Sequence, residues 1–409
     1  MNKLPKGWNY KRLDIISKVV SGYAFPSNDF SKEGVYKTIK ITNVGVQKFI
    51  EIVNDDRLPL KYDDKFSSFR INTNDLVIAL TRSIINDGLK VAIVPKSYDN
   101  SLLNQRVAAI KSKNNMNSFI YYFLTSSVAY NYIQEKSKSL NQPNLSINDL
   151  KAIQIPLPPL SEQTRIVSKL DALFDRIDKS IALLEENIKH TKALMASVLE
   201  EVFRDAETKW KFKKLKLITS KIGSGATPRG GHDSYKTSGI SLIRSMNVHD
   251  GEFRHNGLAF IDDEQAKKLA NVAIEKDDVL LNITGASVAR CSIVDESILP
   301  ARVNQHVSII RPTKILNSHF LQAYLISPET KSKLLFNSSG GATREAITKS
   351  MIENLDVPVP DVKVQERIIN HIQMIKEVNS KIIKEQQSKL TYLKALKSSL
   401  LDWAFKGDL

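Results

Sequence analysis

The chain of 409 residues contains nearly the same junction twice, about half its length apart. IPLPPLSEQTRI occupies residues 155–166, and VPVPDVKVQERI occupies residues 357–368. Each copy has apolar residues, two prolines separated by one residue, a glutamine and, two residues later, an arginine, followed by a long amphipathic run. A match of this length indicates an internal duplication, so the fold is limited to two related halves.

Further anchors keep the two halves in one register, with offsets between 200 and 204 residues. The matched positions are Trp8 with Trp210, 21–22 with 224–225, 41–44 with 245–248, 75–78 with 278–281, 104–107 with 304–307, and 117–118 with 317–318. Between these anchors the halves diverge heavily. Two similar scaffolds with different surfaces indicate two related binding tasks with different targets.

Within each copy the hydrophobic pattern is mixed. Short apolar runs at 76–80, 91–94 and 107–110 are bounded by turn residues and predict strands. Asn86-Asp87-Gly88 predicts a turn in a hairpin-like connection between the first two strands. The segments 118–135 and 318–335 have apolar residues at helical spacing, interrupted at Ser126 or Pro328. Each copy is therefore predicted to be an α+β domain.

The prolines of the junction end each domain. Pro156, Pro158 and Pro159 cannot donate to a β-ladder and keep preceding residues out of the α region. Ser161 is the predicted N-cap of the following helix, with Glu162 in its first turn.

Two long helices are predicted to follow the junctions. In the first helix, residues at steps of three and four form an apolar stripe, in which Thr191 fills one step. Its members are Ile166, Leu170, Leu173, Ile177, Ile181, Leu184, Ile188, Thr191, Met195, Val198 and Val202. In the second they are Ile368, Ile372, Ile375, Val378, Ile382, Leu393, Leu396 and Leu400, with Gln386 interrupting the stripe. Helices of about 45 residues would be roughly 65 Å long. So long and narrow a stripe is typical of a coiled-coil seam.

If the copies are related by an approximate two-fold axis, the long helices pack antiparallel. The alternative is that each helix folds back on its own domain. The predicted fold class is α+β, with two tandem domains at 1–160 and 206–360. The helices at 161–205 and 361–409 separate the domains and form an antiparallel coiled coil.

The net charge of +15 predicts an anionic partner, such as nucleic acid. Residues 1–160 hold 22 Lys and Arg against 13 Asp and Glu, and residues 206–360 hold 21 against 16. The first long helix holds 7 Lys and Arg against 9 Asp and Glu, and the second holds 9 against 6. Most of the excess positive charge therefore lies in the two domains. The single cysteine, Cys291, excludes an internal disulfide framework and favours the cytoplasm. No stretch approaches the roughly 20 apolar residues of a membrane span.

The sequence shows no catalytic constellation. Residues 223–231 are glycine-rich but lack the Gly-Lys-Ser/Thr ending of a phosphate-binding loop. His249 and His255 have no Cys/His spacing around them, so no metal site is predicted. The pattern indicates a protein that binds without catalysing.

Polar and basic residues on loops beside the predicted strands are candidates for contacts to base edges and phosphates. In the first copy these are Thr81, Arg82, Ser83, Asn86, Lys90, Gln105 and Arg106. In the second copy they are Thr227, Arg229, Thr284, Ser287, Arg290, Gln305 and His306. The alternative for each is an ordinary hydrophilic turn.

With these features in place, the chain resembles the specificity subunit of type I restriction-modification systems over essentially its whole length. The first half-repeat is carried by LPKGW at 4–8, SGYAF at 21–25 with IKITNV at 39–44, and IPLPPLSEQ at 155–163. The second is carried by SGATP at 224–228 and GGATR at 340–344. The resemblance implies two target-recognition domains, each reading one half of a split DNA site, with the paired helices acting as a ruler.

The resemblance also implies partners. Two adenine-methyltransferase subunits would hold S-adenosylmethionine, and restriction subunits would use ATP and magnesium, so no cofactor is expected on this chain. The docking candidates are Pro158, Glu162, Gln163 and Arg165 in the first junction and Pro360, Gln365 and Arg367 in the second. The second junction departs from the pattern at 361–364, while its glutamine and arginine keep step.

Two rival functions remain at this stage. A coiled-coil interaction scaffold could bind acidic proteins through its two basic domains, and sequence-selective DNA binding discriminates against it. A stand-alone modification enzyme is disfavoured because the sequence lacks a methyltransferase pocket.

Overall fold

The computed structural model describes residues 4–85, 88–114, 116–137, 144–228, 231–338 and 346–409. The chain forms two compact units: unit 1 is Met1–Glu185 with Ser388–Leu409, and unit 2 is Glu186–Gln387. Each unit therefore contains one copy of the repeat and a part of each long helix. None of the described helices combines the length and apolar character that a membrane crossing requires.

The main sheet of unit 1 has the strand order β11-β8-β13-β2, with antiparallel neighbours. Its strands are β2 (Ser17–Ser21), β8 (Leu76–Ala79), β11 (Val91–Ile93) and β13 (Val107–Ser112). The three strands predicted from apolar runs are confirmed, and all four side chains of β8 are buried. β2 was not predicted, because its apolar run is only two residues long.

Shorter strands complete unit 1. They are β3 (Tyr36–Ile39), β6 (Arg57–Leu58), β7 (Arg70–Ile71) and β12 (Ser101–Leu103) in a second sheet, and the pairs β1 (Asn9–Arg12) with β14 (Gln154–Leu157), β4 (Val44–Gly45) with β5 (Lys48–Phe49), and β9 (Ile84–Ile85) with β10 (Gly88–Leu89). The last pair flanks the predicted Asn86-Asp87 turn, which lies outside the described residues.

The helical segment of unit 1 is broken where the sequence predicted. α2 (Asn117–Leu124) ends before Ser126, and α3 (Ser127–Lys136) begins after it. The Ser126 hydroxyl accepts from the Ala129 amide and caps α3, which explains the break. The short helices α1 (Leu13–Ile16) and α4 (Ile147–Ala152) complete the described α-helices of this domain.

Unit 2 repeats this arrangement. Its main sheet has the order β16-β24-β21-β22, so each strand occupies the place of β2, β13, β8 or β11. The bounds are β16 (Thr219–Ser224), β21 (Val279–Asn282), β22 (Cys291–Ile293) and β24 (Val307–Pro312). The predicted interruption at Pro328 is also confirmed, between α8 (Ser318–Ile326) and α9 (Pro328–Ser338).

The other elements of unit 2 follow the same plan. They are β17 (Ile240–Ile243), β20 (Ala259–Ile261) and β23 (Ala301–Val303) in the second sheet, the pairs β15 (Phe212–Lys214) with β25 (Asp356–Pro358) and β18 (Val248–His249) with β19 (Glu252–Phe253), and the helices α6 (Ala206–Lys209), α7 (Asp263–Lys268) and α10 (Lys349–Glu353). The duplication inferred from the junctions therefore extends to strand order.

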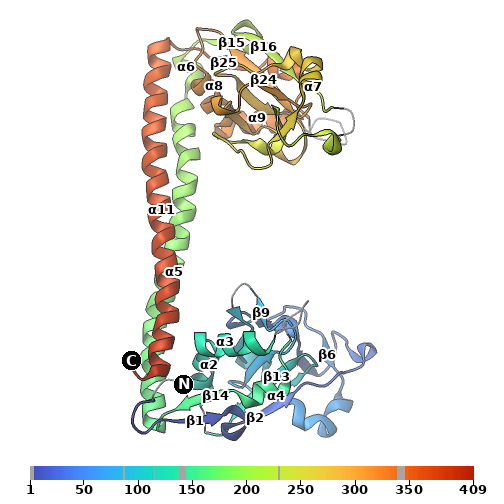
Figure 1. Cartoon of the computed structure of the whole chain (residues 1–409), viewed down its shortest axis with the longest axis vertical. Helices are drawn as coiled ribbons and strands as arrows, with labels where there is room; N and C mark the ends of the chain where they lie inside the picture. The colour runs from blue at the N-terminus through green and yellow to red at the C-terminus, as the bar shows by residue number, and fades with distance from the viewer. Residues whose placement is uncertain (1–3, 86–87, 115, 138–143, 229–230, 339–345) are drawn as a thin grey trace. The chain divides into compact units, whose positions relative to one another are not determined.

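The two long helices are α5 (Leu160–Phe203) and α11 (Val362–Lys406). In unit 1 the first part of α5 lies alongside the last part of α11, so the helices run antiparallel there (Figure 1). Lys397 pairs with Asp178 at 2.7 Å, and Lys394 pairs with Glu185 at 3.4 Å. The antiparallel packing predicted from the stripes is confirmed.

Both helices also contribute to each domain's core. Unit 1 buries Ile166, Leu170, Phe174 and Ile177 of α5 together with Leu400, Leu401, Ala404 and Phe405 of α11. Unit 2 buries Leu199 and Phe203 of α5, with Ile368, Ile369 and Ile372 of α11 packed against the core. Neither helix covers only the domain that precedes it, so the alternative of simple folding back is wrong.

The predicted stripe of α5 is confirmed, since all its members are buried or half-buried. The stripe of α11 needs correction because Val378, Ile382 and Leu396 are 52%, 39% and 41% exposed. Asn379 is 5% exposed and Gln386 is half-buried. Asn379 occupies a seam position, so a count of apolar residues selected its exposed neighbour Val378, whereas Gln386 was already placed in the stripe as an interruption.

The repeated junction forms the same joint in both units. The side-chain amide of Gln163 donates to the Pro158 carbonyl at 2.8 Å, and that of Gln365 donates to the Pro360 carbonyl at 2.8 Å. The predicted N-cap at Ser161 is wrong. α5 begins at Leu160, and the Pro159 carbonyl accepts the amides of Glu162 and Gln163.

Candidate nucleic-acid interface

At one edge of the main sheet in each unit, the ends of two strands lie beside the start of the strand between them. In unit 1, the start of β13 faces the ends of β8 and β2, because Val107 pairs with Ala79 and Ala108 pairs with Ser21. In unit 2, Val307 pairs with Asn282 and Ser308 pairs with Ser224. The loops that carry most of the predicted contact residues therefore meet at this edge.

The repeated Ser-Gly sets how closely these loops approach. A Cβ on Gly22 would lie 1.9 Å from the Asn104 carbonyl oxygen, and one on Gly225 would lie 1.7 Å from that of Val303. Only glycine fits such a backbone approach. The glycine thus holds the loop after β2 or β16 against the segment before β13 or β24.

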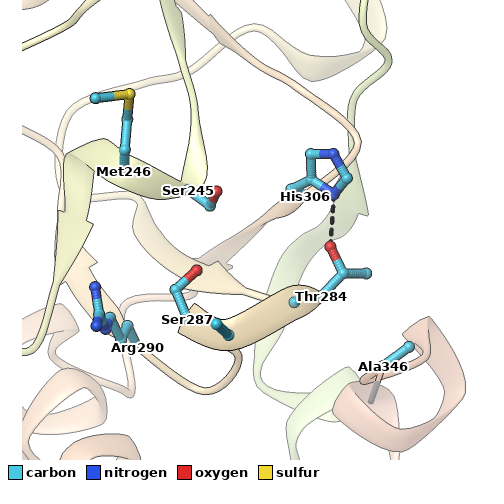
Figure 2. A pocket seen from close by; sticks show the side chains of 9 residues that line it. Ser245, Met246, Thr284, Ser287, Arg290, His306 and Ala346 are labelled. Atoms are coloured by element: carbon cyan, nitrogen blue, oxygen red, sulfur yellow. Dashed lines mark hydrogen bonds between the residues drawn. The ribbon is translucent and has the colours of Figure 1, made fainter. Parts of the chain in front are cut away.

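Unit 2 gathers predicted residues around one pocket of about 990 Å³. Figure 2 shows Arg290 and the Thr284–His306 pair on opposite sides, with the hydroxyls of Ser245 and Ser287 between them. Met246, Gly285, Ala286 and Ala346 complete the lining. The sequence placed Thr284, Ser287, Arg290 and His306 on loops, and the structure brings all four together.

A hydrogen-bond chain orders the rim of this pocket. Thr227 donates to the Gln305 side-chain oxygen, and the Gln305 amide nitrogen lies 3.0 Å from His306 Nε2. The amide can only donate, so His306 Nε2 accepts and Nδ1 carries the proton. Nδ1 then donates to Thr284 Oγ1, 2.5 Å away.

In unit 1 the corresponding edge is more open. Arg82, Gln105 and Arg106 are exposed and Thr81 is half-buried. Arg82 and Arg106 have φ angles of 48° and 71°, in the left-handed region. These four side chains are accessible to a nucleic acid.

Two predicted contact residues of unit 1 need correction. Ser83 is fully buried, so its hydroxyl is not exposed to a nucleic acid. Lys90 is turned inward, where Nζ donates to the Ile41 carbonyl at 3.1 Å. Burial, followed by the charge of Arg82, lowers the pKa of Lys90. Asn86 of unit 1 and Arg229 of unit 2 lie outside the described residues.

Three residues at these edges were not predicted from the sequence. Ser245 and Met246 line the pocket, at the point where the aligned segment 41–44 differs most from 245–248. Tyr23 follows Gly22 in unit 1 and is 39% exposed, although its ring packs against Phe25 and Phe66. Divergence directly beside a repeated anchor could have identified all three.

The docking candidates divide into buried and exposed groups. Pro158, Gln163, Pro360 and Gln365 are buried, so their predicted direct contact with a partner is corrected to a role inside the junction. The Gln365 side chain also donates to the Ile315 carbonyl and accepts the Asn317 amide.

Glu162, Arg165 and Arg367 reach the surface. Arg165 donates to both carboxylate oxygens of Glu162, at 2.7 and 2.8 Å. Val364 stands where Glu162 stands in the first junction, so Arg367 lacks this carboxylate. The two junctions therefore present different charge patterns.

Among the described residues, no group of three or more His, Cys, Asp or Glu side chains is placed to hold a metal ion. The sheet edges instead offer hydroxyls, amides and guanidinium groups, which suit hydrogen bonding to bases and phosphates.

Two copies of one α+β scaffold, each with a polar and basic sheet edge and joined by paired long helices, define a tandem-domain DNA-recognition protein. A family model described as "Type I restriction modification DNA specificity domain" matches residues 5–189 and 207–392. The chain therefore belongs to the type I restriction-modification specificity family and has two target-recognition domains. This result favours DNA recognition over the scaffold alternative.

Characterised relatives agree with this membership. The chain is 27% identical to the Escherichia coli type I restriction enzyme EcoBI specificity subunit, over 98% of this chain and 86% of that protein. It is 36% identical to the E. coli EcoAI specificity subunit over 49% of this chain and 33% of that protein.

Solved structures show the same fold. A chain from a study of complex assembly and conformational transition of the type I R-M system matches with a TM-score of 0.79 and 23% identity, covering 100% of both chains. The HsdS subunit from Thermoanaerobacter tengcongensis matches with a TM-score of 0.61 and 23% identity, covering 100% of this chain and 99% of that one.

Proposed function

We propose that each target-recognition domain reads one half of a bipartite DNA site, and that the chain directs partner subunits to that site. The observation that carries this proposal is one sheet edge present twice with different side chains. Unit 1 offers Arg82, Gln105 and Arg106 as exposed groups, whereas unit 2 surrounds a pocket with hydroxyls, His306 and Arg290. Two different contact surfaces on one scaffold suit two different half-sequences.

The charge distribution supports contact with the phosphate backbone. The excess of basic residues lies mainly in the two domains rather than in the long helices. Neutralised phosphates release counterions, so affinity should fall steeply as salt rises.

The partners proposed are two adenine-methyltransferase subunits, which hold S-adenosylmethionine, and restriction subunits that use ATP and magnesium. Methylation and cleavage would then be performed by the partners, and this chain would supply specificity. The exposed apolar residues Met374, Val378 and Ile382 recur every four residues along α11 and form a surface suited to a partner. Glu162 and Arg165 offer a second, polar contact.

The experiment is methylome sequencing of cells with and without this chain, followed by exchange of residues 206–360 for the corresponding domain of a relative. We expect methylated adenines in one bipartite motif that depends on the chain. The exchange should change one half of that motif and leave the other intact. An unchanged motif, or loss of both halves in a complex that still assembles, would contradict the two-reader proposal.

The ruler role is tested by deleting seven residues from each long helix within the seam. The tolerated spacer between the half-sites should change while both half-sequences persist. An unchanged spacer in an assembled complex would count against the ruler.

A further inference from the structure

Lys90 and Arg290 occupy the same place in the two domains. The amide of Ala79 donates to the Lys90 carbonyl at 3.0 Å, and that of Asn282 donates to the Arg290 carbonyl at 2.8 Å. Both residues directly precede the outer strand of the main sheet, β11 or β22. The scaffold therefore places a cation at one equivalent backbone position in each copy.

The two cations differ in what they contact. Lys90 Nζ is held by the Ile41 carbonyl, at the first residue of η2 (Ile41–Asn43). The equivalent turn of unit 2 is η8 (Ser245–Asn247), and its first carbonyl belongs to Ser245. There the acceptor is already engaged, because Asn282 Nδ2 donates to the Ser245 carbonyl at 2.9 Å.

A side-chain difference beside the cation bears directly on this change. Asn282 is fully buried at the end of β21, where β8 has Ala79. Alanine has no donor, so in unit 1 the carbonyl of the turn is available to Lys90. Asparagine supplies a donor in unit 2 that competes with Arg290 for the Ser245 carbonyl.

Arg290 is consequently available at the pocket. It is half-buried and lines the cavity of about 990 Å³ together with Ser245, Met246, Thr284 and Ser287 (Figure 2). Among the residues that the structure describes, none forms a hydrogen bond or an ion pair with its guanidinium group. A half-buried guanidinium without a protein acceptor leaves its N–H donors available to water or to a ligand.

We infer that Arg290 is a specificity-determining residue of the second target-recognition domain, that it binds the two acceptors of a guanine in the DNA, and that Asn282 is its positioning residue. The inference rests on the proposed function and adds a base class to one half-site. The planar guanidinium fork matches guanine O6 and N7 in the major groove. Met246 supplies an apolar wall beside it, which suits a base better than a hydrated phosphate.

The test uses the full chain in complex with its methyltransferase subunits, and DNA duplexes carrying its methylated motif as the probe. Each guanine of the second half-site is replaced in turn by 7-deazaguanine, which removes N7. Arg290→Lys keeps the charge but loses the fork, and Arg254→Ala is a control that removes one charge outside the pocket.

The complex with the natural chain should lose affinity for one 7-deazaguanine duplex, and Arg290→Lys should reduce discrimination against other bases there by roughly 5- to 150-fold. The Arg254→Ala control should keep the discrimination. If Arg290→Lys weakens binding to all duplexes equally, Arg290 binds a phosphate and the inference is wrong. If the natural complex shows no sequence preference at all, the proposed function itself fails.

The role of Asn282 has its own readout. Asn282→Ala frees the Ser245 carbonyl, so Arg290 should turn onto it as Lys90 does in unit 1. The variant complex should then bind the natural and 7-deazaguanine duplexes equally, while the base preference of the first half-site stays unchanged. Asn282→Leu, which is close in size, carries no charge and loses the donor, checks for a simple packing defect. If both variants still distinguish N7, Asn282 does not position Arg290.

Discussion

Units 1 and 2 share strand order, a broken helix and the same glutamine joint, yet they hold equivalent charges differently. Lys90 is bound inside unit 1, whereas Arg290 faces a pocket in unit 2. The carbonyls of both residues accept the amide of the equivalent strand residue, Ala79 or Asn282. The comparison teaches that the scaffold fixes where a cation stands, while one neighbouring side chain decides whether it can bind a ligand.

A second pair of equivalent cations, Arg311 and Lys111, also differs between the units, in how each binds a carboxylate. Arg311 donates to both carboxylate oxygens of Asp278, at 2.7 and 2.8 Å, and Asp278 is fully buried. At the equivalent place in unit 1, Lys111 lies 3.4 Å from Asp75, which is 9% exposed. The guanidinium fork allows a deeper and better satisfied pair than the ammonium does.

The largest effect is expected from removing an aromatic anchor of one unit. Phe405 packs against Phe119 and Phe123 in unit 1, and its replacement by alanine should destabilise that unit by about 4 kcal/mol. Phe203 packs against Phe320 and Tyr324, so Phe203→Ala should act on unit 2. Hydrogen exchange followed by mass spectrometry reports each unit separately. Equal loss of protection in both units from either variant would show that the units do not unfold independently.

The ion pairs give the next contrast. Arg311→Ala leaves a buried carboxylate without its partner and should cost unit 2 about 3 kcal/mol. Lys111→Ala should cost unit 1 only about 1 kcal/mol, because its pair is longer and partly exposed. Urea denaturation monitored by exchange in each unit measures both values. Similar costs would refute the claim that the guanidinium fork makes the pair stronger.

The two junction glutamines should also differ. Gln365 makes three hydrogen bonds, whereas Gln163 makes one to the Pro158 carbonyl among the described residues. Gln365→Ala should therefore cost about 2 kcal/mol and Gln163→Ala about 1 kcal/mol. Thermal unfolding of the full chain tests the order, which would be wrong if Gln163→Ala were the more damaging change.

The smallest effect concerns Asp56 in unit 1, which accepts from Lys32 and Lys40 at 2.7 and 2.8 Å. These hydrogen bonds lower its pKa to about 2, below the value of about 3.9 expected in the unfolded chain. The contribution is present above pH of about 4 and is lost as pH falls toward 2. Asp56→Asn should cost under about 1 kcal/mol at neutral pH, because the site is partly exposed.

The measurement is unfolding of unit 1 across this pH range. The natural chain and the Asp56→Asn variant should converge as the solution approaches pH 2. A gap that persists unchanged at low pH would mean that the asparagine acts through packing and not through charge.

Local patterns predicted much of this fold. The α5 stripe, the three strands and the helix breaks at Ser126 and Pro328 follow from apolar spacing and turn residues. The α11 stripe was misplaced near Asn379, which occupies the seam, because a count of apolar positions selected its exposed neighbour Val378 instead. β2 was missed because its apolar run is short.

The site was predictable only in part. Aligning the halves located Thr284, Ser287, Arg290 and His306, because loops beside repeated strands must meet at one sheet edge. The difference between Lys90 and Arg290 could not be predicted, since it depends on a contact between Asn282 and a carbonyl 37 residues earlier in the chain.

The order of synthesis delays completion of the core of unit 1, to which both long helices contribute. Leu400, Leu401, Ala404 and Phe405 emerge from the ribosome only after all of unit 2 has been made. The first domain ends at residue 160 and Leu400 follows 240 residues later (400 − 160), so at about 5–20 residues per second the delay is roughly 12–48 s. Each nascent molecule therefore carries an incomplete apolar core in unit 1 for that time, an interval in which exposed apolar surface favours aggregation.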